Sequence, residues 1–496
     1  MTALLWLRRD LRLHDHPALR AALDDGGALV PVFCFDPRLL SGRHASAARA
    51  RFLRESLEEL AESLRRRGSG LVLRQGRPEQ ILASLATELH VTRVFWTGDV
   101  GPFATRRDQA VRRELGSIGV EVHVLPGLFV LDDPSALLSS AGRPYQVFTP
   151  FHRAWIESGR RQILPTPRSL PALPSSLDPG GLPRLGLERV NEQPVRGGEG
   201  EGRRRMHRFL AAGVGDYHVR RDDLGADASS RLSAYLHFGC ISARELEARL
   251  PAGAGGQEFR RQLCWRDFYA HVLAHFPANA RQEFQERYRG SVRWSRAESR
   301  FEAWCNGRTG YPLVDAAMRQ LGLEGWLHNR GRLVVGSFLT KDLGLDWRWG
   351  ERWFMRMLID GDEANNNGNW QWIASVGVDP QPPFRRIYNP SRQQRRFDPT
   401  GAYVRRYVPE LRGVPDEYLA EPWSMPTAVQ RASACVIGRD YPAPIVDHAV
   451  ARREALARYA EAAVRGRPAS PSSRQAGLVS TSCTSQIRRS AKPASQ

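Results

Sequence analysis

Residues 360–372 read Asp-Gly-Asp-Glu-Ala-Asn-Asn-Asn-Gly-Asn-Trp-Gln-Trp, and this stretch decides the character of the larger part of the chain. It holds two aspartates, four asparagines and two tryptophans in thirteen positions. Consecutive Asn and Gly are poor in regular elements, because Asn side chains compete with the backbone for hydrogen bonds. The flanking sequence is aromatic-rich and helical. We therefore expect an irregular polar segment that lines the site of a polar ligand.

The sequence around this stretch predicts a helical domain. Residues 203–464 lack strand patterning and read as many helices with Trp and Arg between them. Residues 160–202 are rich in Pro, Gly, Ser and Arg, so we assign 131–202 to an interdomain linker. Residues 465–496 contain no acid and are rich in Ser, Pro and Arg, which predicts a disordered basic tail.

The N-terminal residues 1–130 alternate strand and helix signals. The strand-like runs are 3–7, 29–35, 71–73, 93–97 and 120–125, and the clearest helical stretch is 47–67. Strands that alternate with helices predict an α/β domain with a parallel, doubly wound sheet. The first strand is not followed by Gly-x-Gly-x-x-Gly. A dinucleotide is therefore expected to bind elsewhere in the chain.

The composition indicates a polyanionic partner. The chain of 496 residues carries 72 basic and 53 acidic side chains, a net charge of +19, with a pI near 10.4. Nucleic acid is the simplest partner for such an excess. Lysine occurs only at positions 341 and 492. A bias toward Arg codons explains that preference for Arg, but not the excess over acids.

Cysteine usage and hydropathy point to the cytoplasm. The six cysteines have no close pair and no zinc spacing, which favours a reducing compartment and no metal site. No cleavable signal pattern precedes the first strand, and no apolar run reaches membrane-spanning length.

A first polar motif suits a phosphate group. Tyr217 and Arg221 precede the run Ser229-Ser230-Arg231-Leu232-Ser233, which stands just before a helical stretch. Clustered hydroxyls, an Arg and free backbone N–H groups at a helix start bind anions well. A plain serine N-cap is the alternative, and by itself the commoner one.

Two further motifs mix aromatic with basic and amide side chains. Residues 304–332 suit an unstacked base and its phosphates. The aromatics of 262–269, taken alone, are more often part of a core than of a binding surface. We expect His328 to be structural, since no nucleophile or partner carboxylate stands near it in the sequence. Separated tryptophans such as Trp294, Trp347 and Trp370 need no role beyond packing.

In order, spacing and residue type, these motifs together resemble the DNA photolyase/cryptochrome family, and within it the class I cyclobutane pyrimidine dimer photolyases. The similarity runs from Leu4-Leu5-Trp6-Leu7-Arg8-Arg9-Asp10-Leu11-Arg12 to about Leu411 and is strongest over 304–389. The resemblance implies an N-terminal α/β antenna domain, a long linker and an all-α domain that holds FAD. An antenna chromophore of deazaflavin or folate type is possible.

The resemblance also implies the cofactor contacts. Arg332 would pair with Asp360, and Asn366 would lie beside flavin N5, where a neutral amide can hydrogen-bond without offering an acidic proton. The implied cofactor-binding residues are Tyr217, Ser229, Ser230, Arg231, Leu232, Ser233, Arg332, Asp360, Gly361, Asp362 and Asn366.

The implied activity is light-driven DNA repair by a monomer. Excited FADH⁻ would give an electron to a flipped-out cyclobutane pyrimidine dimer and regain it after the ring opens. Trp370, Trp347 and Trp294 would form the electron relay, innermost first. The implied DNA and lesion contacts are Arg221, Gln262, Trp265, Arg266, Asn329, Arg330 and Trp372, with Trp265 and Trp372 flanking the lesion.

At two positions the sequence departs from the family pattern, and these departures leave the substrate and the antenna type open. Position 262 is Gln, where cyclobutane photolyases usually carry Glu and 6-4 photolyases carry Gln. Asn329 favours the cyclobutane substrate, because 6-4 enzymes have His there. A cryptochrome photoreceptor is a further alternative, against which Asn366 argues as the photolyase-type residue. Ala104 stands where some relatives have the acid that helps to bind methenyltetrahydrofolate, so the antenna type is open.

Overall fold

The N-terminal part of the chain is a five-stranded parallel sheet. The computed structural model describes residues 2–42, 45–183, 195–379 and 381–466. The strands β1 (Thr2–Leu7), β2 (Ala28–Phe35), β3 (Val72–Gln75), β4 (Val91–Thr97) and β5 (Glu121–Leu125) lie in the order β3-β2-β1-β4-β5. All four strand pairs are parallel, which confirms the predicted doubly wound sheet.

Both faces of this sheet are covered, and this is why its central strands β1 and β2 are almost continuously apolar. Leu4 and Trp6 of β1 pack in the core shared with α4 (Pro78–Glu88) and α5 (Pro102–Ser117). Leu5 and Leu7 point to the other face, where α1 (Pro17–Asp24) and α3 (Ala47–Arg65) lie. That second core continues into the helical part of the chain, so the two parts share one hydrophobic interior.

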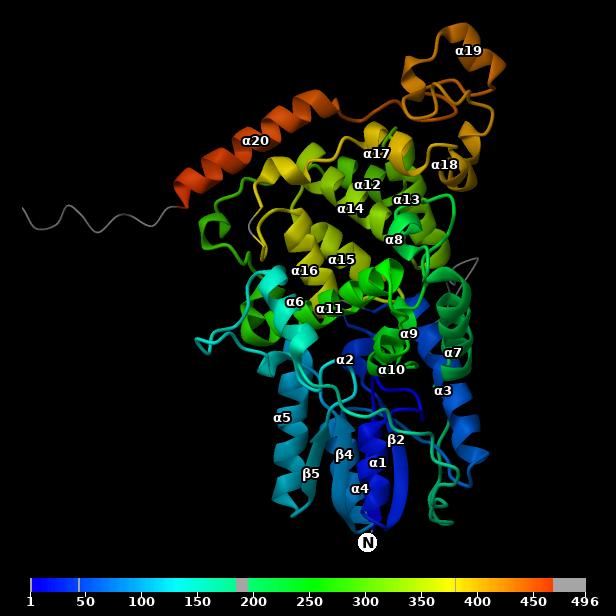
Figure 1. Ribbon diagram of the computed structural model, residues 1–496, viewed down its shortest axis with the longest axis vertical. Helices are drawn as coiled ribbons and strands as arrows, with labels where there is room; N and C mark the ends of the chain where they lie inside the picture. Colours follow the sequence, from blue (N-terminus) through cyan, green and yellow to red (C-terminus); the bar gives the residue numbers. More distant parts are fainter. Residues whose placement is uncertain (1, 43–44, 184–194, 380, 467–496) are drawn as a thin grey trace, which may run out of the picture.

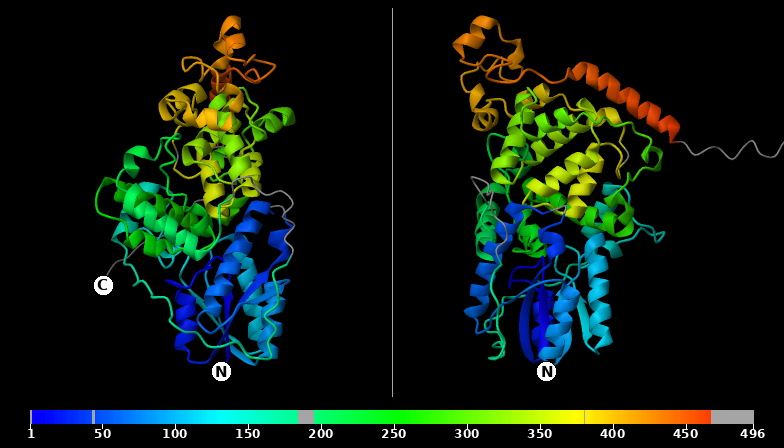
Figure 2. Two further views of the ribbon diagram at one scale, coloured as in Figure 1. Left: turned by 90° about the vertical axis from the view of Figure 1, so that its right-hand side faces the viewer. Right: turned by 180° about the vertical axis from the view of Figure 1, so that it is seen from behind.

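The helical part stands above the sheet in Figure 1, and Figure 2 shows the same stacking from the side and from behind. Its fold confirms the predicted all-α domain. The helices outside the sheet domain are α6 (Phe148–Glu157), α7 (Glu199–Arg208), α8 (Tyr217–Arg220), α9 (Ser233–His237), α10 (Ala243–Ala248), α11 (Ala254–His275), α12 (Glu298–Cys305), α13 (Pro312–Glu324), α14 (Asn329–Ser337), α15 (Trp347–Met357), α16 (Glu363–Ile373), α17 (Pro390–Phe397), α18 (Ala402–Tyr407), α19 (Thr427–Ala432) and α20 (His448–Arg465).

The asparagine-rich stretch is helical, so the expectation of an irregular segment was wrong. Helix α16 covers Glu363–Ile373, and Asp362 is its N-cap. The Asp362 side chain accepts a hydrogen bond from the Asn365 backbone N–H at 2.9 Å. The Asn369 side chain donates to the Asn365 carbonyl within the same helix at 2.8 Å. A strong N-cap and side chains that bond to the helix itself or to neighbouring elements outweigh the poor helix propensity of Asn.

Part of the predicted linker is packed against the helical domain. Helix α6 buries Phe151 and Trp155 completely, and the Trp155 indole donates to Asp267 of α11 at 3.0 Å. The boundaries of the linker stay a prediction. Residues 467–496, almost all of the predicted tail, lie outside the described residues.

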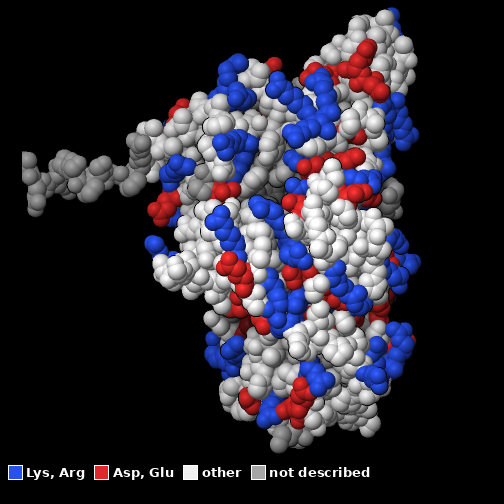
Figure 3. All heavy atoms as spheres, in the orientation of Figure 1, with Lys and Arg blue, Asp and Glu red and all other residues white. Residues whose placement is uncertain are grey.

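The surface carries charge of both signs. Figure 3 shows Lys and Arg side chains spread over one face from the sheet to the helical part, with acids among them. Within the described part of the chain, no helix is long and apolar enough to cross a membrane.

Candidate functional site

A cavity of about 550 Å³ in the helical part gathers the predicted site. Its walls come from the segments that carry α8 and α9, from α11 and α14, and from the end of α15 together with α16. Every residue predicted to bind cofactor, DNA or lesion lines it, from Tyr217 to Trp372. Of the predicted relay, Trp370 lines the cavity, whereas Trp347 and Trp294 lie outside its walls. The fold thus joins four segments that are far apart in the sequence.

The loop 229–233 presents unpartnered hydroxyls to this cavity. The side-chain oxygens of Ser229 and Ser233 are buried and have no hydrogen-bond partner among the described residues. The N-cap of α9 is Leu232, and no side chain caps that helix, so the plain serine N-cap interpretation was wrong. Ser230 is different, since its oxygen accepts from the Leu232 backbone N–H at 3.3 Å.

Contacts with two other side chains hold Arg231 of this loop in place. Its guanidinium lies 2.8 Å from the Glu324 carboxylate and 4.3 Å from the centre of the Trp326 ring. The Arg231 backbone has a φ of 51°, which turns the loop between the two unpartnered serines. Because its charge is already paired, a direct contact of Arg231 with a phosphate stays a prediction.

Asp360 and Arg332 form the predicted ion pair. Arg332 Nη2 lies 2.8 Å from Asp360 Oδ2, which confirms the expectation. The other carboxylate oxygen, Asp360 Oδ1, is buried without a hydrogen-bond partner among the residues that the structure describes. A buried acceptor of this kind is costly unless a ligand donates to it.

Asn366 is oriented by the neighbouring helix α15. Its side-chain nitrogen donates to the backbone oxygen of Glu351 at 2.9 Å and to the carboxylate of Glu351 at 3.3 Å. Both oxygens can only accept, so the amide N–H groups must face Glu351. The carbonyl oxygen of Asn366 is then the atom that remains for a ligand in the cavity.

Each of the two indoles predicted to flank a lesion is supported by a side chain outside the cavity wall. Trp265 stacks on Phe148 of α6 with ring centres 3.6 Å apart and an interplanar angle of 3°. Trp372 lies under the Arg386 guanidinium at 4.0 Å, and its indole donates to Asp379 at 3.3 Å. Phe148 and Arg386 were missed in the sequence, and only the aromatic run 148–155 hinted at the first.

The arginines predicted to contact DNA differ in the partners of their guanidinium groups. Arg221 pairs with Glu258, and Arg330 pairs with Asp222 at 2.7 Å. Arg266 donates to the carbonyls of Leu128 and Leu236 at 2.7 and 3.1 Å, so it links the helical part to the segment after the sheet. A role of Arg266 at the DNA stays a prediction.

His328 is structural, as expected. Its ring nitrogen accepts from the Arg330 backbone N–H at 3.1 Å and thereby caps α14, which begins at Asn329. Burial lowers the pKa of His328 to about 4, so the ring is neutral at physiological pH. Asn329 beside it keeps its place in the cavity wall.

The three relay candidates share one hydrophobic core but differ in depth. Trp370 and Trp347 are buried, while Trp294 is half-buried and lies 6.3 Å from the Tyr459 ring. Trp304, which is fully buried, also contacts Trp370, with ring centres 6.2 Å apart. Gly350 lets α15 and α16 lie close to each other, since a Cβ at position 350 would come within 2.1 Å of the Trp370 ring.

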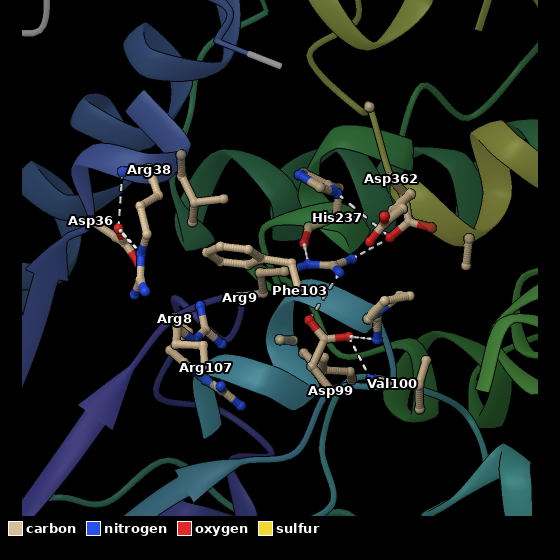
Figure 4. Close-up of a pocket in the computed structure, with 18 of the residues that line it drawn as sticks. Arg8, Arg9, Asp36, Arg38, Asp99, Val100, Phe103, Arg107, His237 and Asp362 are labelled. Atoms are coloured by element: carbon tan, nitrogen blue, oxygen red, sulfur yellow. Dashed lines mark hydrogen bonds and ion pairs between the residues drawn. The ribbon is translucent and has the colours of Figure 1, made fainter. Parts of the chain in front are cut away.

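A second cavity of about 900 Å³ lies between the sheet and the helical part. Residues that follow β1, β2 and β4 line it, and this edge of an open parallel sheet is where ligands usually bind. Figure 4 shows its basic side chains, among them Arg8, Arg38 and Arg107. Ala104 is also in its wall. Within the described residues, no group of three or more His, Cys, Asp or Glu is placed to hold a metal ion.

One ion-pair bridge lies between the two cavities. Arg9, just after β1, is 2.5 Å from Asp362 and 3.2 Å from Asp99, as Figure 4 shows. Asp362 lines both cavities. Burial alone would raise the pKa of Asp362, but the nearby Arg9 cation holds this pKa well below its usual range. Asp362 is therefore ionised while it caps α16.

Comparison with known proteins places the chain in a family. Residues 259–461 match the family model for the FAD binding domain of DNA photolyase, and residues 3–172 match the model for DNA photolyase. The deoxyribodipyrimidine photo-lyase of Streptomyces griseus is 41% identical, over 91% of this chain and 97% of its own length. The chain belongs to the DNA photolyase family. The deoxyribodipyrimidine photo-lyase of Escherichia coli is 36% identical, over 94% of this chain and 100% of its own.

Solved structures of photolyases and a cryptochrome share the fold. A bacterial class III photolyase from Agrobacterium tumefaciens has a TM-score of 0.86 at 35% identity, covering 93% of this chain and 97% of its own. A Synechocystis cryptochrome has a TM-score of 0.85 at 32% identity, covering 92% and 98%. An archaeal photolyase from Sulfolobus tokodaii, solved with two FAD molecules, has a TM-score of 0.81 at 33% identity, covering 93% and 100%.

The residues of the first cavity fit FAD. The cofactor offers a diphosphate, several hydroxyls and a flavin ring. The hydroxyls of Ser229 and Ser233 can donate to phosphate oxygens, and Asp360 Oδ1 can accept from a hydroxyl. The volume of about 550 Å³ is within the usual range for cofactor pockets. A ligand of this type would satisfy the three unpartnered oxygens together.

Replacing the unpartnered serines should weaken FAD binding without harming the fold. We expect Ser229→Ala and Ser233→Ala each to raise the Kd for FAD roughly three- to tenfold, the effect of about 0.5–1.5 kcal/mol for one hydrogen bond. The melting temperature of the FAD-free protein should stay the same or rise, because each change removes a buried hydroxyl that has no partner.

Ser117→Ala is the matched control for these two variants, since its hydroxyl already donates to the Glu114 carbonyl at 2.7 Å and it lies outside the cavity. Titration of the FAD-free protein followed by flavin fluorescence measures all three affinities. An unchanged Kd for Ser229→Ala and Ser233→Ala would contradict their role as cofactor donors.

We expect the ion pair between Arg9 and Asp362 to stabilise the folded protein by an amount that depends on pH. Asp362→Asn keeps an N-cap oxygen but loses the ion pair with Arg9, so we expect a loss on the order of 2 kcal/mol in the free energy of unfolding at pH 7. Because the folded-state pKa is lowered, this contribution is full above about pH 5, begins to shrink as the pH falls below the unfolded pKa, and is lost only below the folded-state pKa.

Urea unfolding at several pH values measures this difference. Asp24→Asn is the control, since Asp24 and its partner Arg20 are more than half exposed and should contribute less than about 1 kcal/mol. A difference for Asp362→Asn that did not become smaller between about pH 5 and pH 2 would contradict the role of its charge.

Proposed function

We propose that this chain repairs cyclobutane pyrimidine dimers in DNA by light-driven electron transfer, as a class I enzyme of its family. The observation that carries the proposal is the single cavity in which a polar cofactor site meets two supported indoles, Trp265 and Trp372. The names of the curated relatives, which are deoxyribodipyrimidine photo-lyases, support the reaction. Asn329 and Asn366 support the cyclobutane substrate and the photolyase type.

The cofactor side of the cavity holds and orients FAD. Bound in its reduced form, FAD supplies the electron that light drives onto the lesion and that returns after the ring opens. Ser229 and Ser233 bind the diphosphate, and Asp360, held by Arg332, binds a hydroxyl of the chain that carries the flavin. Asn366 offers a carbonyl oxygen at the flavin edge because Glu351 takes its N–H groups.

The lesion side of the cavity receives a flipped-out dimer. A dimer is poorly stacked and poorly paired, so it is extruded from the duplex at low cost. Trp265 and Trp372 offer apolar faces to it, and their supports Phe148 and Arg386 prevent the rings from turning away. Arg221, Asn329 and Arg330 at the same cavity contact the neighbouring phosphates. Such contacts make binding strongly salt-dependent.

Trp370, Trp347 and Trp294 carry electrons from the surface to oxidised FAD. Support comes from their gradient of depth, since Trp370 lines the cofactor cavity, Trp347 is buried and Trp294 is half-buried. Trp370 and Trp347 belong to one apolar cluster, and Trp294 packs against it. This relay restores the reduced cofactor but takes no part in the repair step itself.

The second cavity is the site for an antenna chromophore. Its position at the carboxyl ends of the strands and its basic lining suit an anionic aromatic molecule. The Trp6 ring lies 4.6 Å from the Arg8 guanidinium and 4.8 Å from that of Arg107. Both deazaflavin and folate types stay open, and the Sulfolobus tokodaii photolyase shows that a second FAD occurs in one relative. A monomeric, cytoplasmic protein stays the prediction from the sequence.

Illumination of the reduced, FAD-loaded protein with defined lesions tests the proposed reaction. We expect light-dependent loss of cyclobutane dimers, no loss in the dark and no repair of 6-4 products. Repair of 6-4 products instead would mean that Gln262 outweighs Asn329 in the choice of substrate. A flavin-bound protein that repairs neither lesion would make a cryptochrome-type photoreceptor the better account, in line with the Synechocystis neighbour.

Replacing the innermost relay residue should separate photoreduction from repair. We expect Trp370→Phe to slow photoreduction of oxidised FAD strongly, because a phenyl ring is much harder to oxidise than an indole. Repair should persist when FAD is reduced chemically. Trp304→Phe, which alters another buried indole in contact with Trp370, is the control and should leave both rates near the unmodified values. Equal loss in both assays would remove Trp370 from the relay.

A further inference from the structure

Gln262, the residue that departs from the cyclobutane-type pattern, has an acid as its neighbour. Its side-chain nitrogen donates to Glu258 Oε1 at 3.0 Å. Glu258 lies four residues earlier on α11, so the two side chains share one face of the helix. Arg221 pairs with the same carboxylate oxygen. All three residues line the first cavity.

This contact decides which way the Gln262 amide points. A carboxylate can only accept hydrogen bonds, so the NH₂ group of Gln262 must face Glu258 and its oxygen must face away. The reverse orientation would set the two oxygens against each other near 3.0 Å. Arg221 pairs with the same oxygen of Glu258 and holds the carboxylate in place.

Gln262 is well placed to read the edge of an extruded base. It precedes Trp265 by three residues on α11, which puts both side chains on the same helix face. Trp265 can take only one further ring, since Phe148 already covers one of its faces at 3.6 Å. A base that stacks on Trp265 therefore presents its hydrogen-bonding edge to side chains of this part of α11.

Thymine and cytosine offer opposite patterns at that edge. Thymine has an N3–H donor beside an O4 acceptor, whereas cytosine has an N3 acceptor beside an N4–H₂ donor. An amide whose oxygen is fixed beside one remaining N–H matches thymine. The flipped amide matches cytosine. A glutamine that rotates freely would accept both bases.

We propose that Glu258 is a specificity-determining residue, which locks the amide of Gln262 in the orientation that reads thymine and rejects cytosine in the dimer. The inference rests on the proposed repair of cyclobutane dimers and deepens it. It also gives the neutral Gln262 a function distinct from that of a glutamate, because a carboxylate at 262 would carry no N–H for O4 and would repel Glu258.

The test is dark binding of oligonucleotides that carry one thymine–thymine or one freshly prepared cytosine–cytosine cyclobutane dimer. We expect the unmodified FAD-loaded protein to bind the thymine dimer roughly tenfold more tightly, within the range for a bidentate base contact. Glu258→Leu should reduce this ratio to below roughly threefold, mainly by tightening the cytosine complex, because without the acceptor at 258 the amide of Gln262 can turn over.

Two further variants make the result specific. Glu410→Leu removes a carboxylate from a comparable, partly exposed pair with Arg319, at 2.8 Å and away from the cavity, and should leave the ratio unchanged. Gln262→Leu should make the two affinities equal, and adding Glu258→Leu to it should change nothing more.

An unchanged ratio in Glu258→Leu, or an equal weakening for both dimers, would overturn the inference and leave the proposed function intact. A protein that binds neither dimer better than undamaged DNA would overturn both. Light-driven repair of the two dimers by the reduced protein should show the same ratios of kcat/KM, because the contact is made in the bound lesion.

Discussion

The ion pair between Arg9 and Asp362 is the contact on which both sites of this molecule depend. It joins the end of β1 to the start of α16 at 2.5 Å, and Asp99 at the end of β4 supports it. Asp362 is also the N-cap of α16, the helix that carries Asn366, Trp370 and Trp372. If this link were lost, the wall between the two cavities and the start of that helix would loosen together. The domain interface is thus part of the cofactor site.

A second constraint occurs at two places in the first cavity. In each place the carboxylate of a glutamate fixes the orientation of a neighbouring side-chain amide. Glu351 takes the N–H groups of Asn366, and Glu258 takes that of Gln262. In each case the carbonyl oxygen is left for the ligand. An amide in place of a carboxylate adds no charge at its position, but it needs a partner to fix its orientation. Fixed polar groups of this kind provide specificity because they need no rearrangement when the ligand binds.

Much of the fold and the members of the site could be predicted from the sequence. The apolar runs of β1, β2 and β4 indicated the parallel sheet, because strands covered on both faces have a simple pattern. The helix α16 was missed, because its stability comes from the cap at Asp362 and from side-chain contacts rather than from propensity. The anchoring of Arg231 by Glu324, the stacking of Phe148 on Trp265 and the second cavity were also missed, since they depend on contacts between distant segments.

The most direct test of the account is the fluorescence lifetime of the bound, reduced FAD. The central claim is that light excitation moves an electron from this cofactor to a dimer in the same cavity. We expect DNA that carries a thymine dimer to shorten the lifetime, and undamaged DNA of the same sequence to leave it unchanged. The shortening should survive in Trp370→Phe, since the relay is not used in repair. Equal lifetimes with damaged and undamaged DNA, at concentrations that saturate binding, would contradict the claim.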